Sequence, residues 1–106
     1  MDKVQRMARD HGVVIFSKGT CCLSYAVSVL FKDLGVIPYV CQIDHEPDGK
    51  EMEKALIRMG VNSSFLFPAV FIGGSLLGST NEVMSLHLQG SLIQLIQPYI
   101  SILKSN

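Results

Sequence analysis

The chain has 106 residues, of which 48% are hydrophobic and 17% are charged. This length and apolar content predict a single folded domain over residues 1–106, and argue against a multidomain enzyme or a disordered chain. Nine basic residues balance nine acidic ones, which argues against a protein that binds nucleic acid by neutralising phosphates.

The sequence carries no recognisable targeting or membrane signal. Residues 1–10 lack the apolar core of a secretory signal peptide. The apolar run from Phe65 to Ile72 is interrupted by Pro68 and falls far short of the ~20 residues that cross a bilayer. We therefore expect a cytoplasmic protein whose cysteines are reduced thiols rather than disulfide partners.

The first third of the chain predicts a helix, a strand and a second helix. Residues 1–10 are amphipathic at helical spacing. Val13–Phe16 is a continuous apolar run rich in β-branched residues, which indicates a strand buried on both faces. A polar loop over Ser17–Thr20 separates this strand from a helix expected over Cys21–Leu34. The inner stripe of that helix is predicted to consist of Leu23, Val27, Leu30 and Leu34, with Gly35 ending the helix.

The middle of the chain alternates in the same way. We predict a strand over Tyr39–Ile43, a loop over Asp44–Gly49, a helix over Lys50–Met59, and a hairpin of Ala69–Ile72 with Ser75–Leu77. The last helix is expected to start near Asn81 as its N-cap, and a further helical stretch follows Gly90 from Ser91 to about Leu103.

This order of elements predicts an α/β fold. A strand, a crossover helix and a second strand form a parallel pair, and the hairpin adds antiparallel strands. The result is a mixed sheet with helices on both faces. Ligands of such sheets bind beyond the carboxyl ends of the strands. The candidate site is therefore the loop from Ser17 to Cys22.

Cys21 is the candidate nucleophile, because it stands at the predicted start of a helix. Unpaired backbone N–H groups and the helix dipole at such a position favour the thiolate and lower the pKa of a thiol. Lys18 adds a positive charge to the same loop and offers a partner for a carboxylate ligand. The alternative is a small cysteine that only fills space.

The other cysteines have different expected roles. Cys22 is adjacent to Cys21, and it is either a secondary redox thiol or inert. Ser24 stands where a CxxC motif has its second thiol, and its hydroxyl cannot form a disulfide. Cys41 lies in an apolar strand and is expected to pack in the core. The three histidines show no metal-ligand spacing relative to these cysteines.

Three segments together resemble the plant-specific CC-type glutaredoxins: Lys18–Ser24, Phe67–Gly74 and Thr80–His87. The resemblance extends over nearly the whole chain, and the adjacent cysteines replace the Cys-Pro start of ordinary glutaredoxins. It implies a thioredoxin-like fold with a four-stranded mixed sheet, and glutathione as co-substrate.

The resemblance also implies roles for individual residues. Cys21 matches the catalytic cysteine, with Cys22 beside it. The glutathione-binding positions are Lys18, Phe67, Pro68, Thr80 and Asn81. Three positions depart from the pattern of the family. Asn81 stands where many members have Asp, Phe65 where others have a basic residue, and Glu53 where others have Gln. These departures predict a weakened glutathione pocket.

The resemblance supports three functional hypotheses. The first is a monothiol glutathione-dependent oxidoreductase that acts on glutathionylated proteins through Cys21. The second is a redox-sensitive adaptor for TGA-type bZIP transcription factors in cytoplasm and nucleus, docking through the apolar segment Leu92–Leu103. The favoured alternative for that segment is that its leucines pack on the sheet, because an amphipathic helix more often belongs to the core. The third and less favoured one is a [2Fe–2S] cluster between two subunits, with Cys21 of each chain and two glutathione thiolates as ligands.

Overall fold

The computed structural model describes residues 3–19, 22–60 and 67–100. Four strands and five α-helices follow in the order α1 (Lys3–Asp10), β1 (Val13–Ser17), α2 (Cys22–Asp33), β2 (Tyr39–Gln42), α3 (Gly49–Arg58), β3 (Ala69–Ile72), β4 (Ser75–Gly78), α4 (Thr80–Gln89) and α5 (Leu92–Ile96). Two 3₁₀ helices, η1 (Ile43–His45) and η3 (Gln97–Tyr99), are interspersed.

The strands form one mixed sheet in the order β2-β1-β3-β4. β1 pairs with β2 in parallel and with β3 antiparallel, and β3 pairs with β4 antiparallel. Gly73 and Gly74 connect the hairpin with φ of 61° and 86°, the positive values that a tight two-residue turn requires. The predicted α/β fold with a four-stranded mixed sheet is confirmed.

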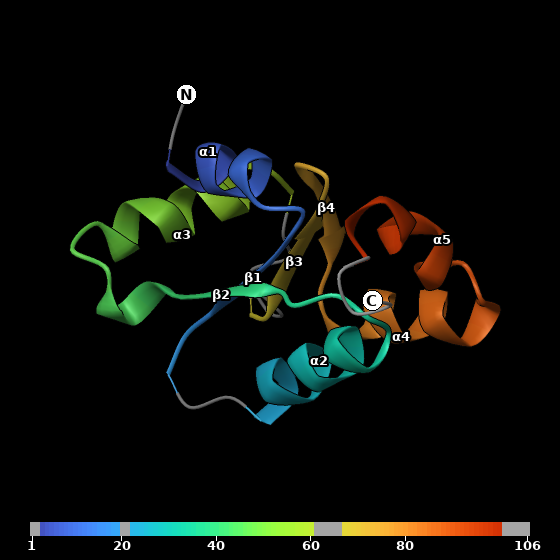
Figure 1. Cartoon of the computed structure of the whole chain (residues 1–106). Helices are drawn as coiled ribbons and strands as arrows, with labels where there is room; N and C mark the ends of the chain where they lie inside the picture. Colours follow the sequence, from blue (N-terminus) through green and yellow to red (C-terminus); the bar gives the residue numbers. More distant parts are fainter. Residues whose placement is uncertain (1–2, 20–21, 61–66, 101–106) are drawn as a thin grey trace.

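Helices cover both faces of this sheet (Figure 1). α1 and α3 lie on one face, and α2 and α4 lie on the other. All five residues of β1 are buried, as predicted for a strand covered on both faces. Val14 and Phe16 pack in the layer of α1 and α3, and Val13 and Ile15 pack in the layer of α2, α4 and α5. β1 is therefore the centre of two hydrophobic cores.

The buried stripe of α2 differs from the predicted one. Leu23 is 51% exposed, whereas Ser24, Val27, Ser28 and Phe31 are buried. Leu30 and Leu34 are partly buried and pack against the core as predicted. The prediction was therefore wrong for Leu23 and right for Val27, Leu30 and Leu34. Apolar periodicity alone does not reveal that the two serines are buried. Gly35 ends the helix as predicted, with hydrogen bonds from Gly35 N to Lys32 O (3.0 Å) and from Val36 N to Phe31 O (2.9 Å).

The chain turns after Gln42, one residue earlier than predicted. Ile43 begins η1 instead of ending the strand, and its carbonyl accepts a hydrogen bond from Glu46 N at 3.0 Å. Its side chain remains buried in the core. Gly49 then begins α3, and a Cβ atom at Gly49 would lie 2.4 Å from the carbonyl oxygen of Ile43. This close approach explains why a glycine stands there.

The start of α4 also differs from the prediction, because its N-cap is Ser79 rather than Asn81. The backbone N–H of Ser79 donates to Glu82 Oε1 at 2.8 Å, and its hydroxyl donates to the same oxygen at 3.1 Å. This is the Ser-x-x-Glu arrangement of a capping box. The Ser79 backbone hydrogen bond lowers the pKa of the Glu82 carboxyl.

The helical stretch after Gly90 is shorter than predicted. Gly90 has φ 80° and separates α4 from α5. α5 ends at Ile96, and η3 follows with Pro98 in its first turn. Residues 101–103 of the predicted helix lie outside the described residues. No helix in the described part of the chain is long and apolar enough to cross a membrane.

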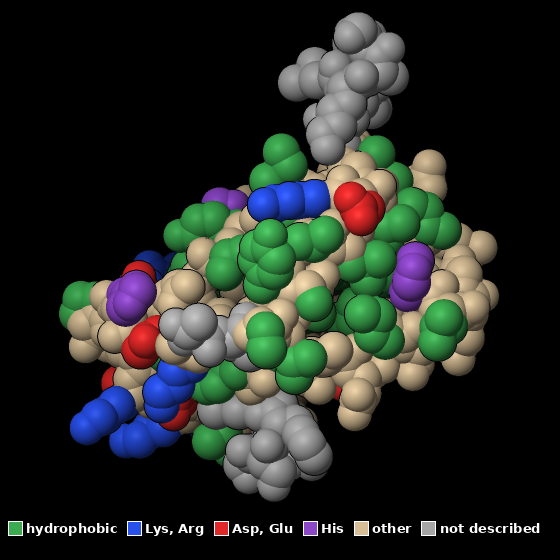
Figure 2. Space-filling view, turned by 90° about the horizontal axis from the view of Figure 1, so that it is seen from below, with side chains coloured by type: hydrophobic (Ala, Val, Ile, Leu, Met, Phe, Trp, Pro, Cys, Tyr) green, Lys and Arg blue, Asp and Glu red, His purple; other side chains and the backbone are tan. Residues whose placement is uncertain are grey.

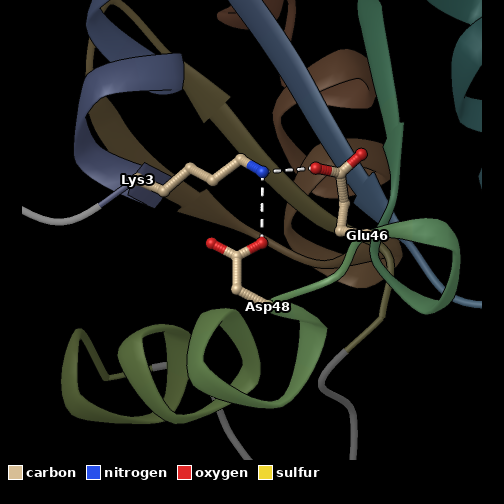
Figure 3. A network of polar contacts seen from close by, with 3 residues as sticks. All are labelled: Lys3, Glu46 and Asp48. Carbon is tan, nitrogen blue, oxygen red and sulfur yellow. Dashed lines mark hydrogen bonds and ion pairs between the residues drawn. The ribbon is translucent and has the colours of Figure 1, made fainter.

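A three-residue charge network joins α1 to the segment before α3 (Figure 3). The Lys3 ammonium donates to the carboxylates of Glu46 and, at 3.1 Å, of Asp48. Its hydrogen bond with Glu46, followed by that with Asp48, raises the pKa of Lys3. The network fastens the N-terminal helix beside α3, where the sequence pattern gave no reason to expect a contact.

We expect Glu82→Ala to lower the free energy of unfolding by about 0.5–1 kcal/mol at neutral pH, because the capping contact to Ser79 is lost. The folded-state pKa of Glu82 lies below its usual value, so its stabilisation is present above that value. This stabilisation is lost as the pH falls through the folded-state pKa.

Urea unfolding at neutral pH and in the acid range measures the difference between variant and wild type. That difference should shrink on acidification. Glu51→Ala is the control, because the Glu51 side chain is 73% exposed on α3, and equal losses in the two variants would contradict the capping role.

Candidate active site

The sheet register brings four separate segments to one edge. Ser17 at the end of β1 aligns with Gln42 at the end of the parallel strand β2. Ala69 pairs with Phe16, so Pro68 enters the sheet at this same edge. Gly78 pairs with Val70, so α4 begins there too. The predicted binding positions Lys18, Phe67, Pro68, Thr80 and Asn81 therefore all lie at this edge.

Cys21 lies outside the described residues, together with Thr20 and Phe65. In the sequence it falls between Gly19, which follows β1, and Cys22, the first residue of α2. Cys22 is exposed. Ser24, one turn into the helix, is buried.

Lys18 forms an ion pair that the sequence did not predict. Its ammonium lies 2.7 Å from Glu53 Oε1, and the two side chains are 51% and 27% exposed. Lys18 comes from the loop after β1, and Glu53 comes from the middle of α3. The group expected to bind a ligand carboxylate is thus already bound to a carboxylate of the chain itself.

Asp44 holds the same loop from the other side. A hydrogen bond from the Gly19 backbone is the main cause that lowers the pKa of the Asp44 carboxyl, and the charges of His45 and Lys18 act in the same direction. Asp44 belongs to η1. The loop that precedes Cys21 is therefore tied to the segment that follows β2.

Two cavities flank this loop. One of about 470 Å³ is lined by Lys18, Asp44, Lys50, Glu51 and Glu53 among others. The second, of about 430 Å³, is lined by polar and apolar groups of β1, α2 and β2, including Ser17, Tyr25 and Gln42. The first cavity contains the Lys18–Glu53 pair and is the one where a carboxylate ligand would meet Lys18.

The Phe67–Pro68 peptide bond is cis, the conformation that the sequence left open. Pro68 is buried and Phe67 is half-buried. Thr80 and Asn81 occupy the first turn of α4. Asn81 is exposed, and the Thr80 hydroxyl is buried and has no hydrogen-bond partner in the described part of the chain.

Residues 13–77 match the Glutaredoxin family. This chain belongs to the glutaredoxin family. It is 61% identical to Glutaredoxin-C13 of Arabidopsis thaliana over 103 residues, which cover 97% of this chain and 99% of the relative. Monothiol glutaredoxin-S9 of the same plant is 61% identical over 99 residues, 93% of this chain and 95% of the relative.

Solved structures of plant glutaredoxins have the same fold. A crystal structure of the buckwheat glutaredoxin–glutathione complex superposes with a TM-score of 0.86 and 31% identity, covering 93% of this chain and 90% of that one. The holo form of glutaredoxin C1 from Populus tremula x tremuloides gives a TM-score of 0.83 at 30% identity, covering 92% and 94%. The resemblance to plant glutaredoxins and the thioredoxin-like fold are confirmed.

The two described cysteines of this glutaredoxin differ sharply in environment. Cys41 packs in the core under α1 and α3, as predicted, and burial is the main cause that raises the pKa of its thiol. Cys22 is exposed. Within residues 3–19, 22–60 and 67–100, no group of three His, Cys, Asp or Glu side chains is arranged to hold a metal ion.

We expect the two thiols to react with iodoacetamide at rates that differ by about tenfold or more. Cys22 is accessible, whereas Cys41 is buried and its raised pKa disfavours the reactive thiolate. A Cys21→Ser variant isolates these two thiols, and mass spectrometry of peptides reports each rate. Unfolding in urea should make the rates similar. Equal rates in the folded protein would contradict the assignment of Cys41 to the core.

Proposed function

We propose that this glutaredoxin is a glutathione-dependent thiol–disulfide oxidoreductase that reduces glutathione mixed disulfides by a monothiol mechanism through Cys21. The observation that carries the proposal is the convergence of Lys18, Pro68 and Thr80 at the sheet edge that precedes Cys21 in the chain. A glutaredoxin of the same fold forms a complex with glutathione, which supports glutathione as the co-substrate.

The proposed reaction has two balanced exchanges. The Cys21 thiolate attacks the glutathione sulfur of a mixed disulfide, a Cys21–glutathione disulfide forms, and the client leaves as a thiolate that takes a proton from water. A second glutathione, as thiolate, then attacks the glutathione sulfur on Cys21. Oxidised glutathione leaves, and the Cys21 thiolate is regenerated.

The neighbouring residues would bind and orient glutathione in this proposal. Lys18 would bind the glycyl carboxylate, and the main chain at Phe67 and Pro68 would pair with the extended tripeptide. Thr80 and Asn81 stand in the first turn of a ten-residue helix, where free N–H groups and the dipole favour the γ-glutamyl carboxylate. Ser24 supplies no second thiol, and the exposed Cys22 is the remaining candidate for a secondary redox role.

We expect Cys21→Ser to abolish the turnover of a glutathione mixed disulfide, and Cys41→Ser to leave it near normal. The physical reason is that Cys41 is buried in the core, and this burial raises the pKa of its thiol and disfavours the reactive thiolate. Steady-state reduction coupled to glutathione reductase measures both variants. Cys22→Ser decides whether the second thiol takes part. Retained turnover in Cys21→Ser would overturn the proposed mechanism.

A [2Fe–2S] cluster is the subsidiary part of the proposal. Its four ligands would be Cys21 of two chains and two glutathione thiolates, so one chain would supply only one ligand. The cluster would add an electron-accepting group to the protein. Anaerobic reconstitution with iron, sulfide and glutathione tests it, and a colourless protein would dispose of it.

The second candidate function is an adaptor for TGA-type bZIP transcription factors, acting in cytoplasm and nucleus. The observation that favours it is an apolar surface. Apolar side chains are visible over the face formed by α2 and α4 in Figure 2. Leu88 of α4 is 85% exposed, and Leu95 of α5 is 44% exposed. In α5, Leu92 and Ile96 are buried instead, so only part of the leucine-rich segment is available to a partner.

We expect Leu95→Ala to weaken retention of a TGA-type bZIP factor by about three- to tenfold in a quantitative pull-down, if α5 is the docking helix. Leu95 is the better test than Ile96, because truncating the buried Ile96 would destabilise the fold. Gln94→Ala on the same helix is the matched control, since Gln94 is exposed and polar. Equal retention of wild type and Leu95→Ala would exclude this docking surface.

A further inference from the structure

The Lys18–Glu53 ion pair places an internal carboxylate at the position where a ligand carboxylate is expected. The distance between Lys18 Nζ and Glu53 Oε1 is 2.7 Å, a full charge-assisted hydrogen bond. We propose that Glu53 is a specificity-determining residue, which competes with the glycyl carboxylate of glutathione for Lys18. This inference rests on the proposed function, and it explains how the chain sets its affinity for glutathione.

The two partners are held with unequal rigidity. Glu53 follows Met52, which is buried in the core together with Ala55 and Leu56 of the same helix. The backbone of α3 at Glu53 is therefore fixed against the sheet. Lys18 stands in the loop after β1, and its long side chain is half exposed. Exchange of partners requires only a movement of the Lys18 side chain, while Glu53 stays in place and repels an incoming carboxylate.

A second carboxylate of the chain, that of Asp44, also repels a ligand carboxylate near Lys18. Asp44 lines the same cavity as Lys18 and Glu53, and its charge interacts with that of Lys18. A ligand carboxylate that approaches Lys18 thus meets the charge of Asp44 as well as that of Glu53. Glu46 and Asp48, which also line the cavity, are paired with Lys3 instead. Lys50 lines the cavity as well, and no ion pair joins it to Glu53 in the described part of the chain.

Partner competition has a consequence that depends on ligand charge. A free glycyl carboxylate can bind Lys18 only if the Lys18–Glu53 ion pair breaks. A neutral ester at that end leaves this ion pair intact. Removing the Glu53 charge should therefore help the acid and not the ester. An exposed or half-exposed ion pair is weak, so the expected gain in affinity is about two- to fivefold.

The experiment compares S-methylglutathione with its glycyl ethyl ester by isothermal titration calorimetry. Glu53→Gln should bind the acid about two- to fivefold more tightly than wild type does, with no change for the ester. Glu51→Gln is the matched control, because it removes the same charge from the same helix and the same cavity wall. Glu51 pairs with Lys54 rather than Lys18. Removing its charge leaves the Lys18–Glu53 pair in place, so Glu51→Gln should raise the affinity for the acid less than Glu53→Gln does.

A double-mutant cycle tests whether the effect passes through Lys18. In a Lys18→Gln background, Glu53→Gln should give no gain for the acid. The inference would be overturned if Glu53→Gln showed no gain in affinity for the acid, or the same gain for acid and ester. It would also be overturned if Glu51→Gln showed an equal gain, or if the gain persisted in the Lys18→Gln background. Failure of wild type and Glu53→Gln alike to bind the acid would overturn it as well. The circular dichroism spectrum and thermal unfolding of each variant confirm that it is folded.

The S-methyl ligand cannot undergo thiol–disulfide exchange, so its binding does not depend on Cys21 chemistry. A protein that shows the Glu53 effect but no turnover of mixed disulfides would retain the competition and lose the proposed enzymatic function. Turnover without the Glu53 effect would retain the enzymatic function and exclude the competition.

Discussion

The burial of β1 on both of its faces is the constraint on which the other parts of this structure depend. Val14 and Phe16 pack into one core, and Val13 and Ile15 pack into the other, so alternate residues belong to opposite layers. A shift of one residue in the pairing would move every side chain to the wrong layer. Phe16 also meets Phe71 of β3 edge-to-face, with ring centroids 5.5 Å apart, which fixes the register of the neighbouring strand. The two cores thereby determine how all strands of the sheet align.

The alignment of the strands in turn locates the candidate site. Ser17 and Gln42 end their parallel strands at the same level, and the Phe16–Ala69 pair brings the cis-proline segment beside them. The start of α4 follows from the pairing of β3 with β4. These segments are far apart in the sequence, and the register of the sheet brings them together. The capping box at Ser79 and the Asp44–Gly19 contact then refine local conformation.

Sequence patterns predicted those parts of the fold that depend on local chemistry or strong periodicity. β1 is a continuous apolar run, and Gly35 and the Gly73–Gly74 turn stand where positive φ is required. The buried face of α2 was predicted only in part. Val27, Leu30 and Leu34 pack against the core, but Leu23 is exposed and the buried residues Ser24 and Ser28 look polar in a sequence. The choice of Ser79 over Asn81 as N-cap was missed because both residues suit that position. The Lys18–Glu53 pair depends on packing α3 beside the β1–α2 loop, and no local pattern encodes that contact.

The site combines strong and weak interactions in different places. Full burial of a side chain such as Phe16 or Phe31 contributes about 1.5–3 kcal/mol, and these residues hold the sheet and α2 in position. The half-exposed Lys18–Glu53 pair contributes about 0–1 kcal/mol, and it lies at the edge of the sheet. Because the pair is weak, Lys18 can exchange Glu53 for another carboxylate without disturbing the core that positions it. The same weakness makes the competition sensitive to a single charge. The interaction of a ligand carboxylate with Lys18 is little stronger than the Lys18–Glu53 interaction that it replaces. Under the proposed competition, rigid burial would set where the ligand meets the chain, and the charge of Glu53 would set how readily Lys18 accepts it.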